Sequence, residues 1–398
     1  MKYILTPNEM QAVERRAMER YSISGLQLME RAALELCRFA QSLKPNDVFI
    51  VCGPGNNGGD GLALARLLHL EGVPVQVRLL VDADALKGDA LANARIVKKL
   101  GLSLTSPWPE HAPDLIVDAL FGTGLNRAPQ GEYLSAIRRI NAYCEQGSRV
   151  LSVDIPSGID GETGRPTGDA AVQATYCMTF QWLKRGHLLA PGRGYCKDLR
   201  LVSIGIPDVE LPLSVFTLEE KDALGLLPAR PWDSHKNSFG HGLLLAGSFG
   251  MAGAAQMAAR AALGGGIGLL SCACPEKSVL PIVQTQVPAA MAIPLSESVP
   301  DAEVLARALS GKTAVAAGPG LGQSDIALAR LRTVWQSELP LIVDADGLNL
   351  LAAHADEFSP RSAPLLLTPH PGEAARLLGR RVEDAIEDAR ELARRYKA

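Results

Sequence analysis

The chain has 398 residues, 47% of them hydrophobic, and a formal net charge of −3 at pH 7. This length fits two domains better than one, and the weak charge without long single-sign runs argues against nucleic-acid binding through a basic face. No apolar stretch reaches the roughly 20 residues that span a bilayer, and the N-terminus turns charged too early for a signal peptide, so we expect a cytoplasmic protein without a membrane partner.

The first half predicts a regular alternation of strands and helices that follows two N-terminal helices. The helices are expected at 6–21, 25–43, 61–70, 85–100 and 132–145, and the strands at 48–53, 73–80, 114–120, 149–156, 174–180 and 199–206. This β-α-β order is typical of an open, mostly parallel sheet with helices on both faces. It predicts a first α/β domain over residues 1–206.

Residues 207–233 are rich in proline and lack a sustained period, which predicts a linker with a short helix. The alternation then resumes over 234–398, with strands expected at 240–248, 267–274, 312–320, 339–346 and 364–370 and helices at 252–263, 301–309, 325–335, 347–355 and from 371. This predicts a second α/β domain. The seven cysteines include no C-x-x-C pair, so reduced thiols are expected, with Cys272 and Cys274 in a core strand.

Three loops of the first domain follow predicted strands, where open α/β sheets bind ligands. The first, "GPGNNGGDG" at 53–61, satisfies the G-x-G-x-x-G pattern of dinucleotide-binding turns, but it carries Asp60 where a phosphate would sit. "DALFGTGLNRAP" at 118–129 and "DIPSGID" at 154–160 are the other two. If their strands are adjacent, the three loops converge.

The polar residues of these loops allow both a functional and a structural interpretation. Asn57, Asp118 and Ser157 offer oxygens suited to a weakly held monovalent cation, or they simply cap helices and turns. The turn 122–128 exposes backbone N–H groups, and Arg127 adds a positive charge, so it binds a phosphate or is simply a tight turn. Asp154 ends an apolar strand and is either a proton-transfer group or an acceptor of turn N–H bonds.

Together these three loops resemble the signature loops of NAD(P)H-hydrate epimerases, and the resemblance covers essentially all of residues 1–206. It implies a Rossmann-like three-layer fold and a substrate hydrated at the nicotinamide C6, NADHX or NADPHX, whose R and S forms are interconverted. By motif, it assigns K⁺ to Asn57, Asp118 and Ser157, and proton transfer to Asp154. The implied substrate contacts are Asn56, Asn57, Gly58, Gly59, Asp60, Gly122, Thr123, Gly124, Leu125, Asn126, Arg127, Ala128 and Asp154.

The second domain carries strand-end motifs "GSFGMAGAA" (247–255), "AAGPGLG" (316–322), "VDADGLN" (343–349) and "LTPHPGE" (367–373). They resemble those of ADP-dependent NAD(P)H-hydrate dehydratases, which implies a ribokinase-like fold, ADP and Mg²⁺ as cofactors, and hydrate contacts at Ala254, Gly322 and His370. The family's lysine-containing nucleotide loop and its G-x-G-D segment do not occur in the chain. We therefore expect a partial dehydratase domain, with no ADP-dependent dehydration by the chain as written and with a longer natural product as the favoured explanation.

Three other functions were weighed. An NAD-dependent oxidoreductase would use Asp82 to hold a ribose, but the Asn-Asn-Gly-Gly-Asp loop argues against it. A small-molecule kinase lacks an anion hole. A non-catalytic scaffold that keeps the epimerase fold is the main alternative, and retention of Asp60, Asp118 and Asp154 argues against it. The family resemblance also suggests a homo-oligomer.

Overall fold

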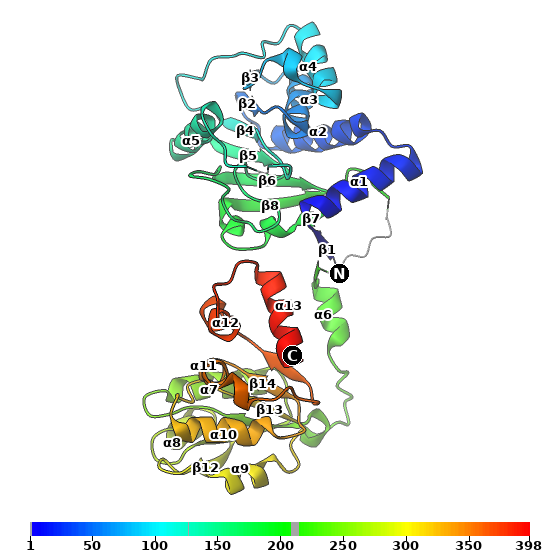
Figure 1. Cartoon of the computed structure of the whole chain (residues 1–398). Helices are drawn as coiled ribbons and strands as arrows, with labels where there is room; N and C mark the ends of the chain where they lie inside the picture. The colour runs from blue at the N-terminus through cyan, green and yellow to red at the C-terminus, as the bar shows by residue number, and fades with distance from the viewer. Residues whose placement is uncertain (1, 126, 208–214) are drawn as a thin grey trace. The chain divides into compact units, whose positions relative to one another are not determined.

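The computed structural model describes residues 2–125, 127–207 and 215–398. The chain divides into two compact units, Met1–Leu227 and Pro228–Ala398 (Figure 1). Their boundary lies within the segment 207–233 that the sequence predicts as a linker. Within the described ranges, no helix combines the length and the apolar character that a membrane span needs.

The main sheet of the first unit is parallel throughout, with strand order β3-β2-β4-β5-β6-β8. Its strands are β2 (Val48–Cys52), β3 (Val75–Leu79), β4 (Leu115–Ala119), β5 (Arg149–Val153), β6 (Ala174–Phe180) and β8 (Cys196–Val202). The helices are α1 (Pro7–Tyr21), α2 (Gly25–Ser42), α3 (Asn56–Leu70), α4 (Gly88–Lys99), α5 (Glu132–Glu145) and α6 (Glu220–Leu226). Single 3₁₀ turns lie at Ala83–Ala85 (η1), Arg185–His187 (η2) and Gly192–Tyr195 (η3).

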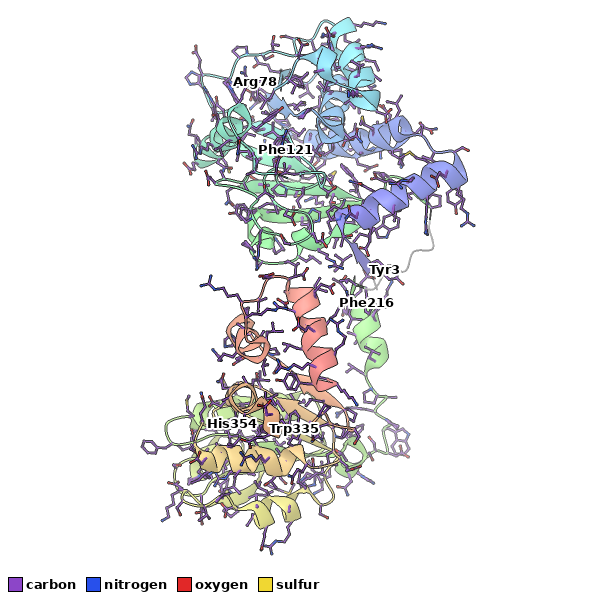
Figure 2. All side chains as sticks on the ribbon, viewed as in Figure 1. Tyr3, Arg78, Phe121, Phe216, Trp335 and His354 are labelled. Carbon is purple, nitrogen blue, oxygen red and sulfur yellow. The ribbon has the colours of Figure 1, made fainter. Side chains whose placement is uncertain are left out.

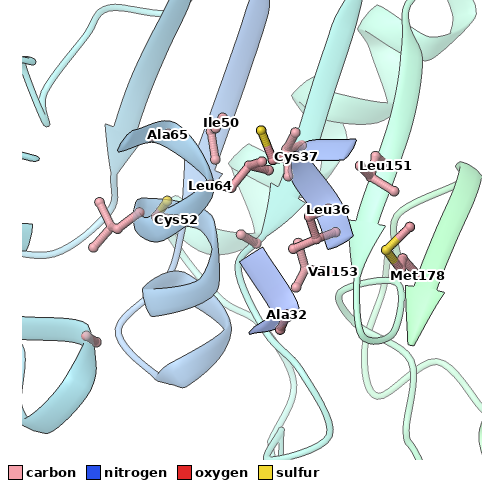
Figure 3. Close-up of a cluster of buried hydrophobic side chains, with 14 of the residues drawn as sticks. Ala32, Leu36, Cys37, Ile50, Cys52, Leu64, Ala65, Leu151, Val153 and Met178 are labelled. Carbon is pink, nitrogen blue, oxygen red and sulfur yellow. The ribbon is translucent and has the colours of Figure 1, made fainter. Parts of the chain in front are cut away.

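Alternating side chains of these strands build two hydrophobic layers, as the two-residue period of a strand requires. On one face, Ile50 of β2 packs with Leu36 of α2 and Leu64 of α3 (Figure 3). On the other face, the neighbouring Phe49 packs with Ile137 of α5. The first unit is therefore a three-layer α/β sandwich, as the sequence predicts.

A second, small sheet pairs the N-terminal strand with two strands from later in the same unit. Strand β1 (Lys2–Leu5) lies between β7 (Leu183–Lys184) and β9 (Phe216–Thr217), and Tyr3 is the register partner of Phe216 (Figure 2). The sequence analysis did not predict these short strands. Helix α1 starts directly after β1 with a capping box of Thr6 and Glu9, so this sheet fixes where α1 lies.

The second unit has a parallel sheet of order β12-β11-β10-β13-β14-β15. Its strands are β10 (His241–Leu245), β11 (Leu269–Pro275), β12 (Met291–Leu295), β13 (Ala314–Ala317), β14 (Leu341–Val343) and β15 (Leu365–Leu367). Its helices are α7 (Ala252–Gly264), α8 (Leu280–Gln286), α9 (Ala302–Leu309), α10 (Asp325–Trp335), α11 (Asp346–Ala353), α12 (Pro371–Leu378) and α13 (Ala385–Tyr396), with 3₁₀ turns η4 (Lys236–Phe239) and η5 (Ala355–Glu357). Cores lie on both sheet faces, and β11 contains the buried Cys272 and Cys274.

Two local predictions were wrong. Helix α3 begins at Asn56 rather than at Gly61, because its first six residues contain three glycines whose low helix propensity hides the helical pattern. Helix α8 and strand β12 were not predicted, because prolines at 281 and 294 interrupt each of these short segments.

Candidate active sites

A cavity of about 600 Å³ opens at the carboxyl end of the first unit's sheet. Strand β3 lies on one side of β2 in the sheet, and β4 lies on the other side. The loops that follow β2 and β4 therefore run in opposite directions and form a topological switch point, where this class of fold binds ligands. The cavity is lined by Asn56, Asn57 and Asp60 of α3 and by Asp154 after β5. It is also lined, from the loop after β4, by Gly122, Thr123, Gly124, Leu125 and Arg127.

Among the described residues, the predicted contacts Gly58, Gly59 and Ala128 do not line this cavity. Gly58 and Gly59 are buried inside α3, and a Cβ at Gly58 would lie 2.0 Å from the carbonyl oxygen of Gly53. Gly58 lets the start of the helix approach the loop after β2, and Gly59 lets it pack against Met29 of α2 and Ala90 of α4. Ala128 lies against Gly168, because a Cβ added to Gly168 would be 3.0 Å from the Cβ of Ala128. Asn126 falls outside the described residues.

Asp154 occupies the floor of the cavity in an unusual backbone conformation. It has φ +64°, in the left-handed region that few residues other than glycine adopt. Its Oδ1 accepts hydrogen bonds from Lys184 Nζ at 2.6 Å and from Thr179 Oγ1 at 3.0 Å. Lys184 is only 2% exposed and Asp154 is 14% exposed. The strand-tip carboxylate is therefore paired, as the cost of burying a charge requires.

His187 holds the backbone of both partners. Its Nδ1 accepts the backbone N–H of Lys184 at 3.0 Å, which leaves Nε2 to donate to the carbonyl oxygen of Asp154 at 2.7 Å. Burial, followed by the nearby ammonium of Lys184, lowers the pKa of His187 to about 4. The imidazole is therefore neutral near pH 7 and fixes the left-handed turn at Asp154.

The pKa values of the carboxyl groups around the cavity are shifted in opposite directions. Burial is the largest effect and acts to raise the pKa of Asp154, but the ammonium of Lys184 and the hydrogen bonds from Lys184 and Thr179 help to hold this pKa below its usual value. For Asp60, burial and then the negative charge of Asp154 raise the pKa well above its usual value. Burial and the charge of Asp154 also raise the pKa of Glu14, which α1 brings to the same cavity.

Asp118 and Ser157 lie together but do not line the cavity. Asp118 is fully buried; its Oδ1 accepts from Ser157 Oγ at 2.6 Å and from Leu120 N–H at 3.3 Å, and its Oδ2 accepts from Ser152 Oγ at 2.8 Å and from Ser157 N–H at 2.9 Å. Burial raises the pKa of Asp118 despite these bonds. Among the described residues, no cationic side chain forms an ion pair with it.

This environment fits a weakly held monovalent cation. A cation would balance a buried carboxylate that only neutral groups now stabilise, and Asn57 on the next loop adds a carboxamide. Asn57 is 8% exposed, and its Nδ2 has no hydrogen-bond partner within the described parts of the chain. One carboxylate with neutral oxygens suits such an ion better than Mg²⁺.

In the second unit, the predicted contacts lie on neighbouring strand-end loops. Gly320 (φ +60°) lies so close to Ala254 that a Cβ added to Gly320 would be 3.0 Å from the Cβ of Ala254. Gly322 (φ +79°) donates its backbone N–H to the Asp346 carboxylate at 2.9 Å. His370 caps α12 with a side chain that is 63% exposed, and its Nδ1 accepts from Gly372 N–H at 3.0 Å. Ala254 and the loop that carries Gly322 are therefore brought together, and His370 follows β15 at the same end of the sheet.

Sequence reasoning missed Lys184, His187, Thr179 and Glu14. The sequence analysis drew nothing from the motif "LKRGH" at 183–187, although Lys184 is buried and is the register partner of Leu5 in β1. The sequence did indicate that Asp154, a carboxylate at the end of a buried strand, needs a partner. It did not indicate which residue that partner is.

Comparisons with known proteins agree with the arrangement in both units. Residues 25–186 match the family described as "YjeF-related protein N-terminus", and residues 242–398 match "NAD(P)H-hydrate dehydratase". A bifunctional NAD(P)H-hydrate repair enzyme of Thermofilum pendens is 37% identical over 98% of this chain and 78% of its own length. The corresponding Coxiella burnetii enzyme is 39% identical over 95% of this chain and 76% of its own.

Two solved structures share partial similarity with the chain. An ADP/ATP-dependent NAD(P)H-hydrate dehydratase of Bacillus subtilis is 33% identical over 45% of this chain and 63% of its own length, with a TM-score of 0.39. A yeast protein is 18% identical over 55% of this chain and 97% of its own, with a TM-score of 0.43. The chain thus spans less than two thirds of the B. subtilis structure. The sequence relatives, which it matches over almost its whole length, show that the chain belongs to the family of bifunctional NAD(P)H-hydrate repair enzymes.

Proposed function

We propose that the first unit interconverts the R and S forms of NAD(P)H hydrate in the cavity at its topological switch point. The observation that supports this most strongly is the pair of Asp154 and Lys184 on the cavity floor, which keeps a carboxylate ionised beside a ligand-sized space. An ionised carboxylate at that position is suited to accept a proton from a hydroxyl group of a bound ligand. Family membership supplies the substrate class.

The other lining residues are assigned to binding. Arg127 and the backbone N–H groups of 122–125 would contact phosphate oxygens, since cations and glycine-rich turns favour anions. Asn56, Asn57 and Asp60 would contact the hydrated ring. Gly58, Gly59 and Ala128 would act only by allowing close approach of the backbone.

We assign a monovalent cation, K⁺ by family resemblance, to Asn57, Asp118 and Ser157. When bound, it supplies a positive charge that balances Asp118 and steadies the loops that carry Asn57 and Phe121. The protein already links these loops, because Phe121 N–H donates to Ser157 Oγ at 2.9 Å. Replacing K⁺ by an organic cation is expected to lower the melting temperature of the first unit.

For the second unit we propose ADP-dependent dehydration of the S hydrate in the complete protein, with hydrate contacts at Ala254, Gly322 and His370. Two observations support this proposal: the chain belongs to the family, and the loops that carry Ala254 and Gly320 are in close contact. The described residues contain no group of three or more His, Cys, Asp or Glu side chains that could hold a metal ion.

The test is the rate of exchange between the R and S hydrates, followed by NMR on the full chain with and without K⁺. We expect exchange well above the uncatalysed rate and a fall when K⁺ is replaced by N-methylglucamine. An uncatalysed rate in both conditions, together with tight binding of the hydrate, would instead support the scaffold function. A K⁺-independent but fast rate would remove only the cation from the proposal.

A further inference from the structure

Asp60 differs from Asp154, the paired carboxylate of the cavity, by its lack of partners. Within the described residues, its carboxyl group forms no hydrogen bond and no ion pair, although it lines the same cavity as Asp154. Asp154, in contrast, receives both Lys184 Nζ and Thr179 Oγ1. Two carboxyl groups that face one ligand space thus have opposite environments, and such pairs divide acid and base roles.

We propose that Asp60 is the proton donor of this site and Asp154 its proton acceptor, and that Lys184 is the positioning residue that keeps the two carboxyl groups in different charge states. The inference rests on the proposed epimerase function and adds its acid, its base and the origin of their asymmetry. Asp60 and Asp154 would contact the reacting atoms. Lys184 would act only through Asp154.

The chemistry needs one acid and one base, because C6 of the hydrate is bonded to both the hydroxyl oxygen and the ring nitrogen N1. Asp154 takes the hydroxyl proton, a C6=O double bond forms, and the C6–N1 bond breaks with its electron pair on N1. N1 takes the proton of Asp60. Rotation about the C5–C6 bond turns the other face of the aldehyde toward N1, and the same steps in reverse close the ring. Both carboxyl groups return to their first state, and no oxidant or reductant is required.

Lys184 is held where this role requires it. Its ammonium group donates to Asp154 Oδ1 at 2.6 Å, to Thr179 Oγ1 at 2.8 Å and to the carbonyl oxygen of Phe180 at 3.4 Å. These three acceptors match the three donors of an ammonium group. A lysine that is 2% exposed and has all its donors satisfied is fixed in place, so it stabilises the negative charge of Asp154 through every turnover.

The charged groups that face this pair are mostly carboxyl groups. Glu14 comes from α1, Asp60 from α3 and Asp89 from α4, and all three line the cavity. Burial, and then the negative charges of Asp154 and Glu14, raise the pKa of Asp60, and the ammonium of Lys184 opposes them. Arg127 lies at an exposed position of the lining, and His187 is neutral near pH 7.

The first test is Asp60→Asn in the full chain, which keeps the size and a hydrogen-bond donor but has no proton to release. We expect R/S exchange to fall roughly 100-fold, the contribution of a general acid, with KM within about twofold of the unchanged protein. The loss of rate at high pH, which we expect from ionisation of Asp60, should disappear from the profile. A full rate with an unchanged pH profile would overturn the assignment. Asp84→Asn is the matched control, because this side chain is 91% exposed.

The second test compares Lys184→Met with Lys184→Arg. Without the ammonium group, burial raises the pKa of Asp154, so Lys184→Met should lose most activity at acidic and neutral pH and regain part of it as the pH rises. Lys184→Arg keeps the charge and should shift the profile less. An equal loss at every pH in Lys184→Met would show a purely structural role and overturn the positioning role.

The wild-type rate separates this inference from the proposed function. If the unchanged chain does not accelerate R/S exchange, the epimerase proposal fails. If it does, and if Asp60→Asn and Lys184→Met both keep the wild-type rate and pH profile, only the acid–base assignment fails.

Discussion

The ion pair between Asp154 and Lys184 should dominate the stability of the first unit's active site. At 2.6 Å between Nζ and Oδ1, the direct attraction is about 6 kcal/mol at an effective dielectric constant of ~20, and the cost of desolvating both groups offsets much of it. Asp154→Asn would leave a buried ammonium group with only Thr179 and the Phe180 carbonyl as partners. We expect the free energy of unfolding to fall by about 3–5 kcal/mol.

Lys184→Met should cost less, roughly 2–3 kcal/mol, because Asp154 can take up a proton. The double variant removes both charges, so its loss should be smaller than the sum of the single losses by at least about 2 kcal/mol. The coupling depends on pH. The folded-state pKa of Asp154 is lowered, so its contribution to stability is present above the pKa of the unfolded chain and is lost as the pH falls through the folded value.

Hydrogen–deuterium exchange in urea on the full chain measures this coupling. Peptides from β5 and β6 report the first unit, and peptides from β13 and β14 provide an internal reference that should not change. The matched control is the exposed pair of Asp198 and Arg200, joined at 2.8 Å with 42% and 45% of the side chains exposed, where we expect coupling below about 1 kcal/mol. Coupling below about 0.5 kcal/mol for the buried pair would refute the reasoning.

Two further predictions concern the support of the site. Gly58→Ala should lower the melting temperature of the first unit and abolish R/S exchange, because its Cβ would lie 2.0 Å from the Gly53 carbonyl oxygen; Gly194→Ala, with open space around it, should not alter the melting temperature. His187 has its pKa lowered to about 4 by burial, so its ¹⁵N NMR signals should not titrate between about pH 5.5 and pH 8. A midpoint near the ordinary histidine value would contradict the neutral ring that holds Asp154.

Much of the fold could be predicted because its signals are local. The helix expected over 132–145 is α5 (Glu132–Glu145), and the one expected over 325–335 is α10 (Asp325–Trp335), since both have clear apolar periodicity and ends. Strand ends were also predictable, which placed Asn57 and Asp154 on the cavity. Short elements such as β1 and β7 carry too few residues for a pattern and form only through pairing between distant segments.

The site was less predictable than the fold, because its key pairings are non-local. The partner of Asp154 lies 30 residues further along the chain, and the buried Lys184 belongs to β7, which pairs with the distant β1. Charge asymmetry between Asp60 and Asp154 depends on burial and on Lys184, neither of which a motif encodes. Conversely, the glycines of "NNGGDG" suggested a ligand loop, although Gly58 and Gly59 are used for packing within α3.

The most direct test of the account is the R/S exchange rate of NAD(P)H hydrate with Asp154→Asn, compared with the unchanged chain at equal concentrations of folded protein. Hydrogen exchange under native conditions gives the folded fraction, which corrects for the expected loss of stability. We predict that the rate per folded molecule falls at least tenfold, in line with the roughly 10²–10⁴-fold contribution of a general base. An unchanged rate per folded molecule would show that proton transfer at this site does not depend on Asp154.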